Sequence, residues 1–387
     1  MFDPRDPVFL ADPYPAFAAL RAEGEVHRHD DLGLAIAVSH AASAAVLRHR
    51  GLGRIWQDVR PAERFASFNL LHRNSLLENE PPAHTRLRRL ISGAFARGHV
   101  ERLRPMVAEF AETMVDELAG KIAAEGSADL LEHLAQPLPV AVIAELLGVP
   151  DADRPRLVPW SNSIVKMYEF DLPEEGRDAA EAAAAEFVAY LRELAEARAA
   201  SPGDDIVSDL LRSELTPDEL VATAVLLLMA GHEATVNVIG NGVAALLTYR
   251  NQWERLIASP ELLDSAVEEL IRFDSPLQLF ERTATEDVEI AGFRVARGEK
   301  IGALLGAAAR DPKVFAEPDV LDIGRSPNAH LGFGMGIHYC VGAPLARVEI
   351  GAALKALTTR LPELRLVTAE RRPEFVIRGL KELRVSV

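Results

Sequence analysis

The chain contains one cysteine, Cys340, and aromatic residues make up only 6% of its 387 positions. A single thiol cannot form an internal disulfide, which fits a reducing cytoplasm. Basic residues are also fewer than acidic ones: 42 Lys and Arg stand against 58 Asp and Glu, which gives a net charge of −16. Nucleic-acid binding needs a clustered basic face, so we expect no nucleic-acid partner.

Long apolar runs are lacking too. The first residues read MFDPRDPVFLADPYP, which is neither a signal peptide nor a membrane anchor. The apolar run LVATAVLLLMAG ends at His232 and Glu233, too early for a membrane span. We therefore expect a cytoplasmic protein with no membrane partner. We also expect it to be a monomer.

Hydrophobic residues make up 49% of the chain, enough for a large core. No repeat or linker divides it, so we predict a single domain over residues 1–387. Apolar residues at spacings of three and four predict helices, and alternating β-branched residues predict a few strands. The expected fold class is mainly α with small β-sheets. Helices are predicted at 13–23, 83–96, 99–125, 128–147, 176–200, 216–249, 262–273 and 342–360, and strands around 25–38, 278–296 and 364–387.

The helix at 216–249 has a clear start, because Thr216 is an N-cap, Pro217 fits the first helical position and Glu219 completes a capping box. The segment that follows is apolar nearly all round, which is typical of a helix through the middle of a domain. His232 and Glu233 would be costly to bury there unless they have partners or a function.

The only thiol lies in the segment HLGFGMGIHYCVGAPLARVE, residues 330–349, among four glycines. Glycines allow left-handed turns and close backbone approach. A helical pattern resumes after Cys340, and a helix N-terminus favours a thiolate over a thiol. A zinc site at Cys340 would need other Cys or His ligands in addition to His338. A cysteine hydrolase would need a catalytic His and an Asn or Asp that orients it. A lone cysteine can also be a small buried hydrophobe.

The pattern Phe333-Gly334-x-Gly336-x-His338-x-Cys340-x-Gly342 resembles the haem-binding signature of cytochromes P450. The resemblance implies the cytochrome P450 fold, with a haem-binding loop at about 330–342 and haem b (iron protoporphyrin IX) as the cofactor. It implies that Cys340 ligates the iron, that Phe333 packs beside the sulfur and that His338 bonds a haem propionate. Thiolate ligation favours cleavage of an O–O bond.

Further motifs of the same family follow in the expected order. Glu269 and Arg272 match its Glu-x-x-Arg helix, and Arg325 follows a segment that resembles its meander, which implies a structural Glu-Arg-Arg network. The segment that begins at Pro81 resembles the C-helix of the family. The resemblance implies that the propionates are bound by His84, Arg88 and Arg282.

The central helix departs from the family at Ala234, where the oxygen-activation motif ordinarily has Thr after the acid. In the family, the acid and the hydroxyl deliver protons to the reacting dioxygen. We hypothesise that Glu233 still delivers protons, through ordered water or a hydroxyl of the substrate. Two alternatives are chemistry that depends less on proton delivery, such as oxidative coupling or peroxide-driven oxidation, and compensation by Thr235.

The resemblance also assigns pocket-lining segments at 51–80, 161–178, 224–235, 276–281 and 376–381. Their apolar side chains favour a small hydrophobic or amphipathic substrate. These side chains include Leu227, Ala230, Leu279 and Phe280, together with Trp56, Phe65, Phe68 and Met229.

We therefore expect an enzyme, a cytochrome P450 monooxygenase of secondary metabolism. It is expected to receive electrons from a ferredoxin and a ferredoxin reductase, with Arg86, Arg89 and Arg347 as a local basic patch for docking. The alternatives from other classes are a haem-thiolate sensor that does not catalyse and a cysteine hydrolase.

Overall fold

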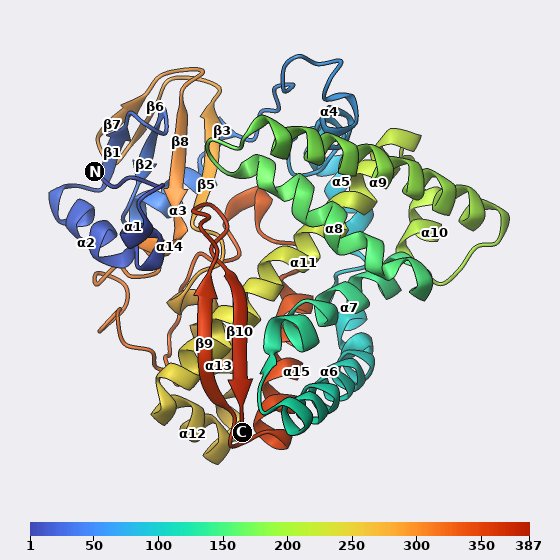
Figure 1. Cartoon of the computed structure of the whole chain (residues 1–387). Coiled ribbons are helices and arrows are strands. Elements are labelled where there is room, and N and C mark those ends of the chain that lie inside the picture. Colours follow the sequence, from blue (N-terminus) through green and yellow to red (C-terminus); the bar gives the residue numbers. More distant parts are fainter. The chain divides into compact units, whose positions relative to one another are not determined.

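Helix α11 (Pro217–Thr248) is the apolar core helix that the sequence predicts, as the computed structural model shows (Figure 1). The structure describes residues 1–96 and 98–387. By length and composition α11 could cross a membrane, but 78% of its most apolar window is buried inside the protein. The predicted capping box forms: the Glu219 N–H donates to Thr216 Oγ1 at 3.2 Å, and the Thr216 N–H donates to the Glu219 carboxylate at 3.0 Å.

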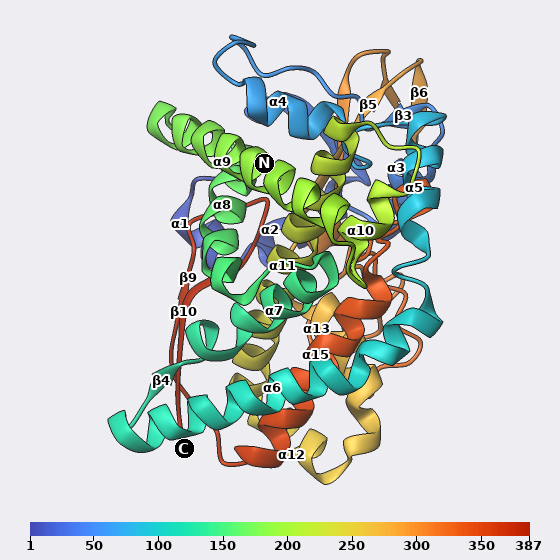
Figure 2. The ribbon, with the colours of Figure 1, turned by 90° about the vertical axis from the view of Figure 1, so that its right-hand side faces the viewer.

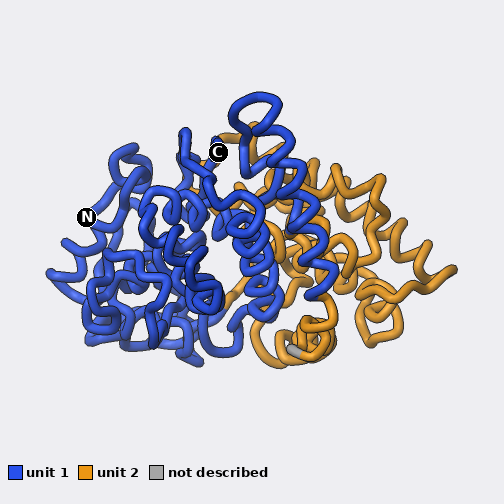
Figure 3. The backbone as a smooth tube through the Cα atoms, turned by 90° about the horizontal axis from the view of Figure 1, so that it is seen from below, with its two compact units in different colours: residues 1–53, 104–138, 234–387 blue, residues 54–103, 139–233 orange. Residues whose placement is uncertain are grey.

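The chain folds into two compact units, each built from separate stretches of sequence (Figure 3). Unit 1 comprises residues 1–53, 104–138 and 234–387, and unit 2 comprises residues 54–103 and 139–233. Helix α11 contributes residues to both. The single domain expected over 1–387 stays a prediction.

Unit 2 is helical. Its helices are α4 (Ala66–Arg73), α5 (Ala83–Ser92), most of α7 (Pro137–Leu147), α8 (Arg154–Val165), α9 (Glu174–Ala200) and α10 (Ile206–Leu211). Helix α9 packs on α8 and α4 (Figure 2), and small side chains on its buried face, Ala180 and Ala184, permit close approach. The Glu181 carboxylate accepts the Ser67 and Phe68 N–H groups at 2.9 Å each and so caps α4.

Unit 1 holds the described sheets. The largest has the order β1 (Val26–His29), β2 (Leu34–Ala37), β8 (Lys300–Leu304), β5 (Leu279–Ala284), β3 (Leu52–Gly53). Only β2 and β8 in it pair in parallel. A second sheet has the order β4 (Ala128–Asp129), β10 (Leu380–Ser386), β9 (Arg365–Arg371), and β6 (Val288–Ile290) pairs with β7 (Phe293–Val295).

Helices make up much of the rest of unit 1, together with the part of α11 from residue 234. They are α1 (Pro7–Ala11), α2 (Tyr14–Glu23), α3 (His40–Arg48), most of α6 (Arg97–Glu125), α12 (Arg250–Ala258), α13 (Leu263–Phe273), α14 (Leu305–Ala308) and α15 (Ala343–Arg360). Helix α13 packs on α15, and a Cβ atom on Gly351 would make ordinary van der Waals contacts with Val267 and Leu263 there.

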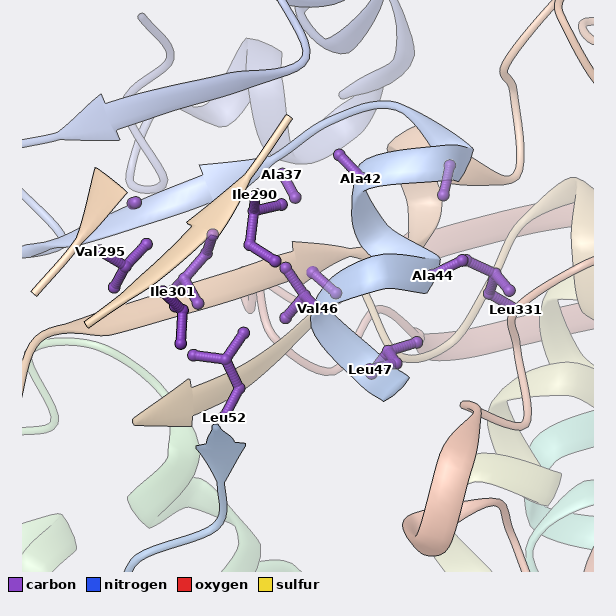
Figure 4. Packing of buried hydrophobic residues seen from close by; sticks show 14 of the residues in the cluster. Ala37, Ala42, Ala44, Val46, Leu47, Leu52, Ile290, Val295, Ile301 and Leu331 are labelled. Carbon is purple, nitrogen blue, oxygen red and sulfur yellow. The ribbon is translucent and has the colours of Figure 1, made fainter. Parts of the chain in front are cut away.

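A hydrophobic cluster joins α3 to the five-stranded sheet (Figure 4). Val46 and Leu47 of α3 pack with Ile301 of β8, all at most 4% exposed. Leu331, at the start of the loop that carries Cys340, is 1% exposed and belongs to the same cluster. The core of unit 1 therefore supports that loop directly.

Asp274, just after α13, joins the two ends of the chain. Its carboxylate accepts hydrogen bonds from Tyr14 Oη at 2.7 Å, Arg378 Nε at 2.7 Å and Arg371 Nη2 at 2.6 Å. Arg378 also donates to the Leu10 carbonyl at 2.5 Å. Burial alone would raise the pKa of Asp274, but the two guanidinium groups outweigh it and lower the pKa to about 2.

The predicted fold class is confirmed, because 56% of the chain is helical and the sheets are small. The helix predicted at 128–147 is wrong in its first part. Residues Ala128 and Asp129 form β4 and pair with β10, Leu131–Ala135 form a π-helix, and α7 begins at Pro137. The Asp129 carboxylate accepts the Leu131 and Leu383 N–H groups at 3.0 Å each, a link to a distant strand that local periodicity cannot show.

The capping box predicts a measurable loss of stability. We expect Thr216→Ala to lower the free energy of unfolding by about 1 kcal/mol, because the Glu219 N–H loses its acceptor. Thr359→Ala, at an exposed position inside α15, should be neutral or slightly stabilising. Thermal unfolding of the two variants compares them, and equal midpoints would contradict the cap.

Candidate functional site

The loop before α15 presents Cys340 at the helix N-terminus. The Cys340 N–H donates to the Phe333 carbonyl at 2.9 Å, and Gly342 is the N-cap residue of α15. The thiol is exposed, so it is not the buried hydrophobe that one alternative described. Among the described residues, no group of three or more His, Cys, Asp or Glu side chains is placed to hold a metal ion.

Two glycines shape this loop through left-handed backbone angles, with φ of 69° at Gly334 and 74° at Gly336. A Cβ atom on Gly336 would lie 2.7 Å from the Leu47 carbonyl oxygen of α3. The following turn ends at His338, which is half-buried. Only glycine therefore lets the loop lie against α3 at this point.

The Glu269 carboxylate of α13 is completely buried and accepts hydrogen bonds from its own helix and from the segment 322–328. Arg272 donates to it through Nε and Nη2 at 2.8 Å each, and Arg325 Nε donates at 3.1 Å. The Asp322 N–H at 2.9 Å and Asn328 Nδ2 at 3.1 Å complete the set. The structure thus brings together Glu269, Arg272 and Arg325, as the sequence predicts, and adds two further donors.

The neighbouring Glu268 binds His330 of the cysteine loop and Arg347 of α15. It accepts from Arg347 Nε at 2.5 Å and Nη2 at 2.9 Å, and it lies 3.0 Å from His330 Nε2. Burial raises the pKa of Glu268, but hydrogen bonds from Arg347 and His330 outweigh it and lower the pKa to about 2. Neither Glu268 nor His330 was among the residues that the sequence singled out.

Strand β5 carries three more of the predicted residues of unit 1. Leu279 is buried, Phe280 is half-buried and Arg282 is only 2% exposed. The Arg282 guanidinium lies 4.6 Å from the centroid of the Phe280 ring, and its Nη1 donates to the Glu281 carbonyl at 2.9 Å. Most arginines in strands are solvated, so this burial sets Arg282 apart.

The middle of α11 carries the predicted oxygen-activation residues. Ala230 and Ala234 are exposed, although the surrounding helix is buried, and their spacing of four places them on one face. Glu233 is 7% exposed, and Thr235 is 4% exposed. The Ala234 side chain is therefore accessible, whereas Thr235 is buried about a hundred degrees around the helix.

Helix α5 of unit 2 holds two residues predicted to bind propionates. His84 is 3% exposed and Arg88 is half-buried, and their spacing of four places them on one helix face. Arg86, predicted to help dock a redox partner, forms an ion pair with Glu219. The other member of that patch on this helix, Arg89, is exposed.

Unit 2 also contains a hollow of about 690 Å³, lined by residues between 54 and 80. Its walls include Arg54, Asp58 and Arg73, with Trp56 beside them. Because charged groups line it, it differs from the apolar pocket predicted for this segment. The predicted pocket residues Phe65 and Phe68 are 0% and 2% exposed, and their role as pocket lining stays a prediction. Leu227 and Met229 of α11 are buried as well.

The comparisons with known proteins agree with this architecture. A family model described as cytochrome P450 matches residues 57–361. Cytochrome P450 monooxygenase PikC of Streptomyces venezuelae is 40% identical over 391 residues, covering 97% of this chain and 91% of that protein. The biotin biosynthesis cytochrome P450 of Bacillus subtilis is 36% identical over 386 residues, covering 98% and 97%. The solved structure of P450BioI with a hexadec-9Z-enoic acid ligated acyl carrier protein has a TM-score of 0.94 at 35% identity, covering 98% and 99%.

The backbone of the cysteine loop yields a paired prediction. Gly336→Ala should destabilise the protein by about 1–3 kcal/mol, because the new methyl group meets the Leu47 carbonyl at a left-handed φ. Gly120→Ala, on α6 where a Cβ meets nothing within 4 Å, should stabilise by up to about 1 kcal/mol. Thermal unfolding distinguishes them, and a Gly336 variant as stable as the parent would refute the close approach.

Proposed function

The chain belongs to the cytochrome P450 family, and we propose that it is a haem-thiolate monooxygenase acting on a small hydrophobic or amphipathic organic molecule. Members of this family are enzymes with haem b as the cofactor. The observation that carries the proposal is the exposed Cys340 thiol, presented at the start of α15 by a loop fixed on two carboxylates.

The residues present fit a flat, metal-bearing group with two negative charges. Cys340 offers an exposed sulfur ligand, Arg282 offers a buried positive charge, and Ala234 offers an open face with a small side chain. Buried cations suit propionates, since charge-assisted hydrogen bonds are strong. We assign the iron ligand to Cys340, the ring beside the sulfur to Phe333, close backbone approach to Gly342, and propionate binding to His84, Arg88, Arg282 and His338.

The haem, when bound, supplies the oxidising chemistry, and thiolate ligation favours O–O bond cleavage. Glu233 holds and delivers protons in this proposal. Ala234 offers no hydroxyl, and Thr235 is buried while Ala234 is exposed. This arrangement supports an ordered water or a substrate hydroxyl beside Glu233 over direct compensation by Thr235.

Electrons come from NAD(P)H through a ferredoxin reductase and a ferredoxin. The predicted docking arginines contribute unequally, because Arg86 is paired with Glu219 and Arg347 with Glu268. Exposed Arg89 retains the most accessible charge of the three. We place the reaction in secondary metabolism in the cytoplasm, with a protein that acts as a monomer.

The axial ligand gives the most direct test. The reduced, carbon monoxide-bound protein should show the red-shifted Soret band of a thiolate-ligated haem. Cys340→His should keep haem but lose that band, because imidazole donates less electron density than thiolate. Haem-loaded wild-type protein without the red-shifted band would overturn the proposal, and would favour neither the monooxygenase nor a haem-thiolate sensor.

Proton delivery predicts the behaviour of Ala234→Thr. If a water or a substrate hydroxyl replaces the missing side chain, the added hydroxyl should change the fraction of NAD(P)H electrons that reach product, by about tenfold in either direction. The measurement compares NADH consumed, peroxide released and product formed. Unchanged coupling and unchanged product would instead favour oxidative coupling or peroxide-driven chemistry.

A further inference from the structure

Two segments predicted to line the substrate pocket, 276–281 and 376–381, lie side by side in unit 1. Leu277 and Ile377 pair in an antiparallel bridge. We propose that Arg371 is a positioning residue that holds the second segment in place and so determines which ligands the pocket accepts. The inference rests on the proposed function, because it concerns the substrate pocket of the same enzyme.

The paired residues offer an apolar surface to a ligand. Leu277 and Ile377 are opposite each other, so their side chains lie on the same face. Both are half-buried, as is Phe280 farther along the first segment. Val376 and Arg378 are only 8% and 5% exposed, which fits the alternation of side chains along an extended segment. Ile377 is therefore accessible to a ligand, whereas Arg378 points into the protein.

The first step of the argument is the hold on Arg378. Its Nε donates to the Asp274 carboxylate at 2.7 Å, and its backbone N–H donates to the Pro276 carbonyl at 2.7 Å. Asn241 of α11 donates through Nδ2 to the Arg378 carbonyl at 3.1 Å. Because side chain and backbone of Arg378 are both fixed, the place of the adjacent Ile377 is fixed as well.

The second step is Arg371, the last residue of β9. Its Nη2 donates to Asp274 at 2.6 Å, and its Nη1 donates to Asn241 Oδ1 at 3.3 Å. Arg371 thus joins the two side chains that bind Arg378, a task that suits the several donors of a planar guanidinium group. Without it, a bond of 3.4 Å from Asn241 Nδ2 to the Asp274 carbonyl would have to keep the two together, and the segment would be held less firmly.

The third step places the segment beside α11. A Cβ atom on Gly379 would collide with the Asn237 side chain, so the backbone of the segment lies directly against this helix. Ala234, whose side chain is accessible, lies three residues before Asn237. The segment therefore lies near the residue that we assign to the open side of the haem, where its position affects what binds.

Arg371 can be replaced at a tolerable cost to the fold. Its side chain is 30% exposed. After its loss, Asp274 still accepts hydrogen bonds from Arg378 and Tyr14. Replacement of Asp274 itself would instead leave buried guanidinium charge without its carboxylate and would threaten folding. Variants of Arg371 therefore test the position of the segment.

The experiment titrates haem-loaded Arg371→Gln with two inhibitors that ligate iron and shift the Soret band. Imidazole is small, whereas clotrimazole is an imidazole with three aromatic rings that must also fit the pocket. We expect the dissociation constant of clotrimazole to rise about fivefold, because a loosely held segment must be ordered when a large ligand binds. The constant for imidazole should stay unchanged. Equal weakening of both inhibitors would mean a general disturbance and would overturn the inference.

Arg365→Gln is the matched control. It removes the same charge from the first residue of β9, where Arg365 and Glu363 form an exposed pair at 3.7 Å. If Arg371→Gln and this control give the same ratio of the two constants, the inference is wrong. Ile377→Ala should also weaken clotrimazole binding. An unchanged constant in that variant would mean that the segment does not touch the ligand, and this result overturns the inference too.

If Arg371→Gln does not retain haem, Arg371→Lys decides the question. It keeps the charge but cannot bond Asp274 and Asn241 together, so a wild-type ratio in that variant contradicts the role of Arg371. Wild-type protein that binds imidazole but not clotrimazole would lack the open pocket that the inference requires.

The proposed function fails by a different result. Wild-type protein whose Soret band does not shift with imidazole contradicts the haem assignment itself. A normal shift in the wild type, with an unaltered ratio in the variants, contradicts only the role of Arg371.

Discussion

The structure depends on the complete burial of one carboxylate. Glu269 can lie at 0% exposure only because guanidinium, amide and backbone donors from distant segments satisfy it. Each donor is thereby fixed as well: Arg272 on α13, Arg325 in the segment before the loop and Asn328 at its entrance. A buried charge without such partners would cost several kcal/mol, so these donors stabilise the buried carboxylate together.

This constraint and three further contacts fix the cysteine loop in place. Leu331 is part of the hydrophobic cluster that includes α3 and the sheet, Gly336 lies against the backbone of α3, and Glu268 binds His330. Rigid elements thus surround a thiol that itself remains exposed. This combination suits a ligand that must meet a large planar group in one orientation.

Much of this could be predicted from the sequence where the signal is local. The capping box at Thr216 and the glycine pattern around Cys340 each lie within a few residues, and both have the predicted geometry. Glu268 was missed because its partner His330 is 62 residues away in the sequence. A glutamate on a helix is also ordinarily exposed, so its residue type gave no sign of a partner. The strand at Ala128 was missed for the same reason, since its partner lies in β10.

The placement of residues in α11 shows what periodicity leaves open. The sequence predicts a buried helix with Glu233 in it, but it does not tell that Ala234 faces an open surface while Thr235 is buried. That distinction depends on which neighbours surround each face.

The Asp274 cluster has a consequence for biogenesis. Tyr14 lies 260 residues before Asp274 and Arg378 lies 104 residues after it, yet both bind this one buried carboxylate. The complete cluster therefore cannot form until residue 378 has been synthesised. Contacts between such distant residues slow folding, so we expect the cluster to be among the last parts of unit 1 to form.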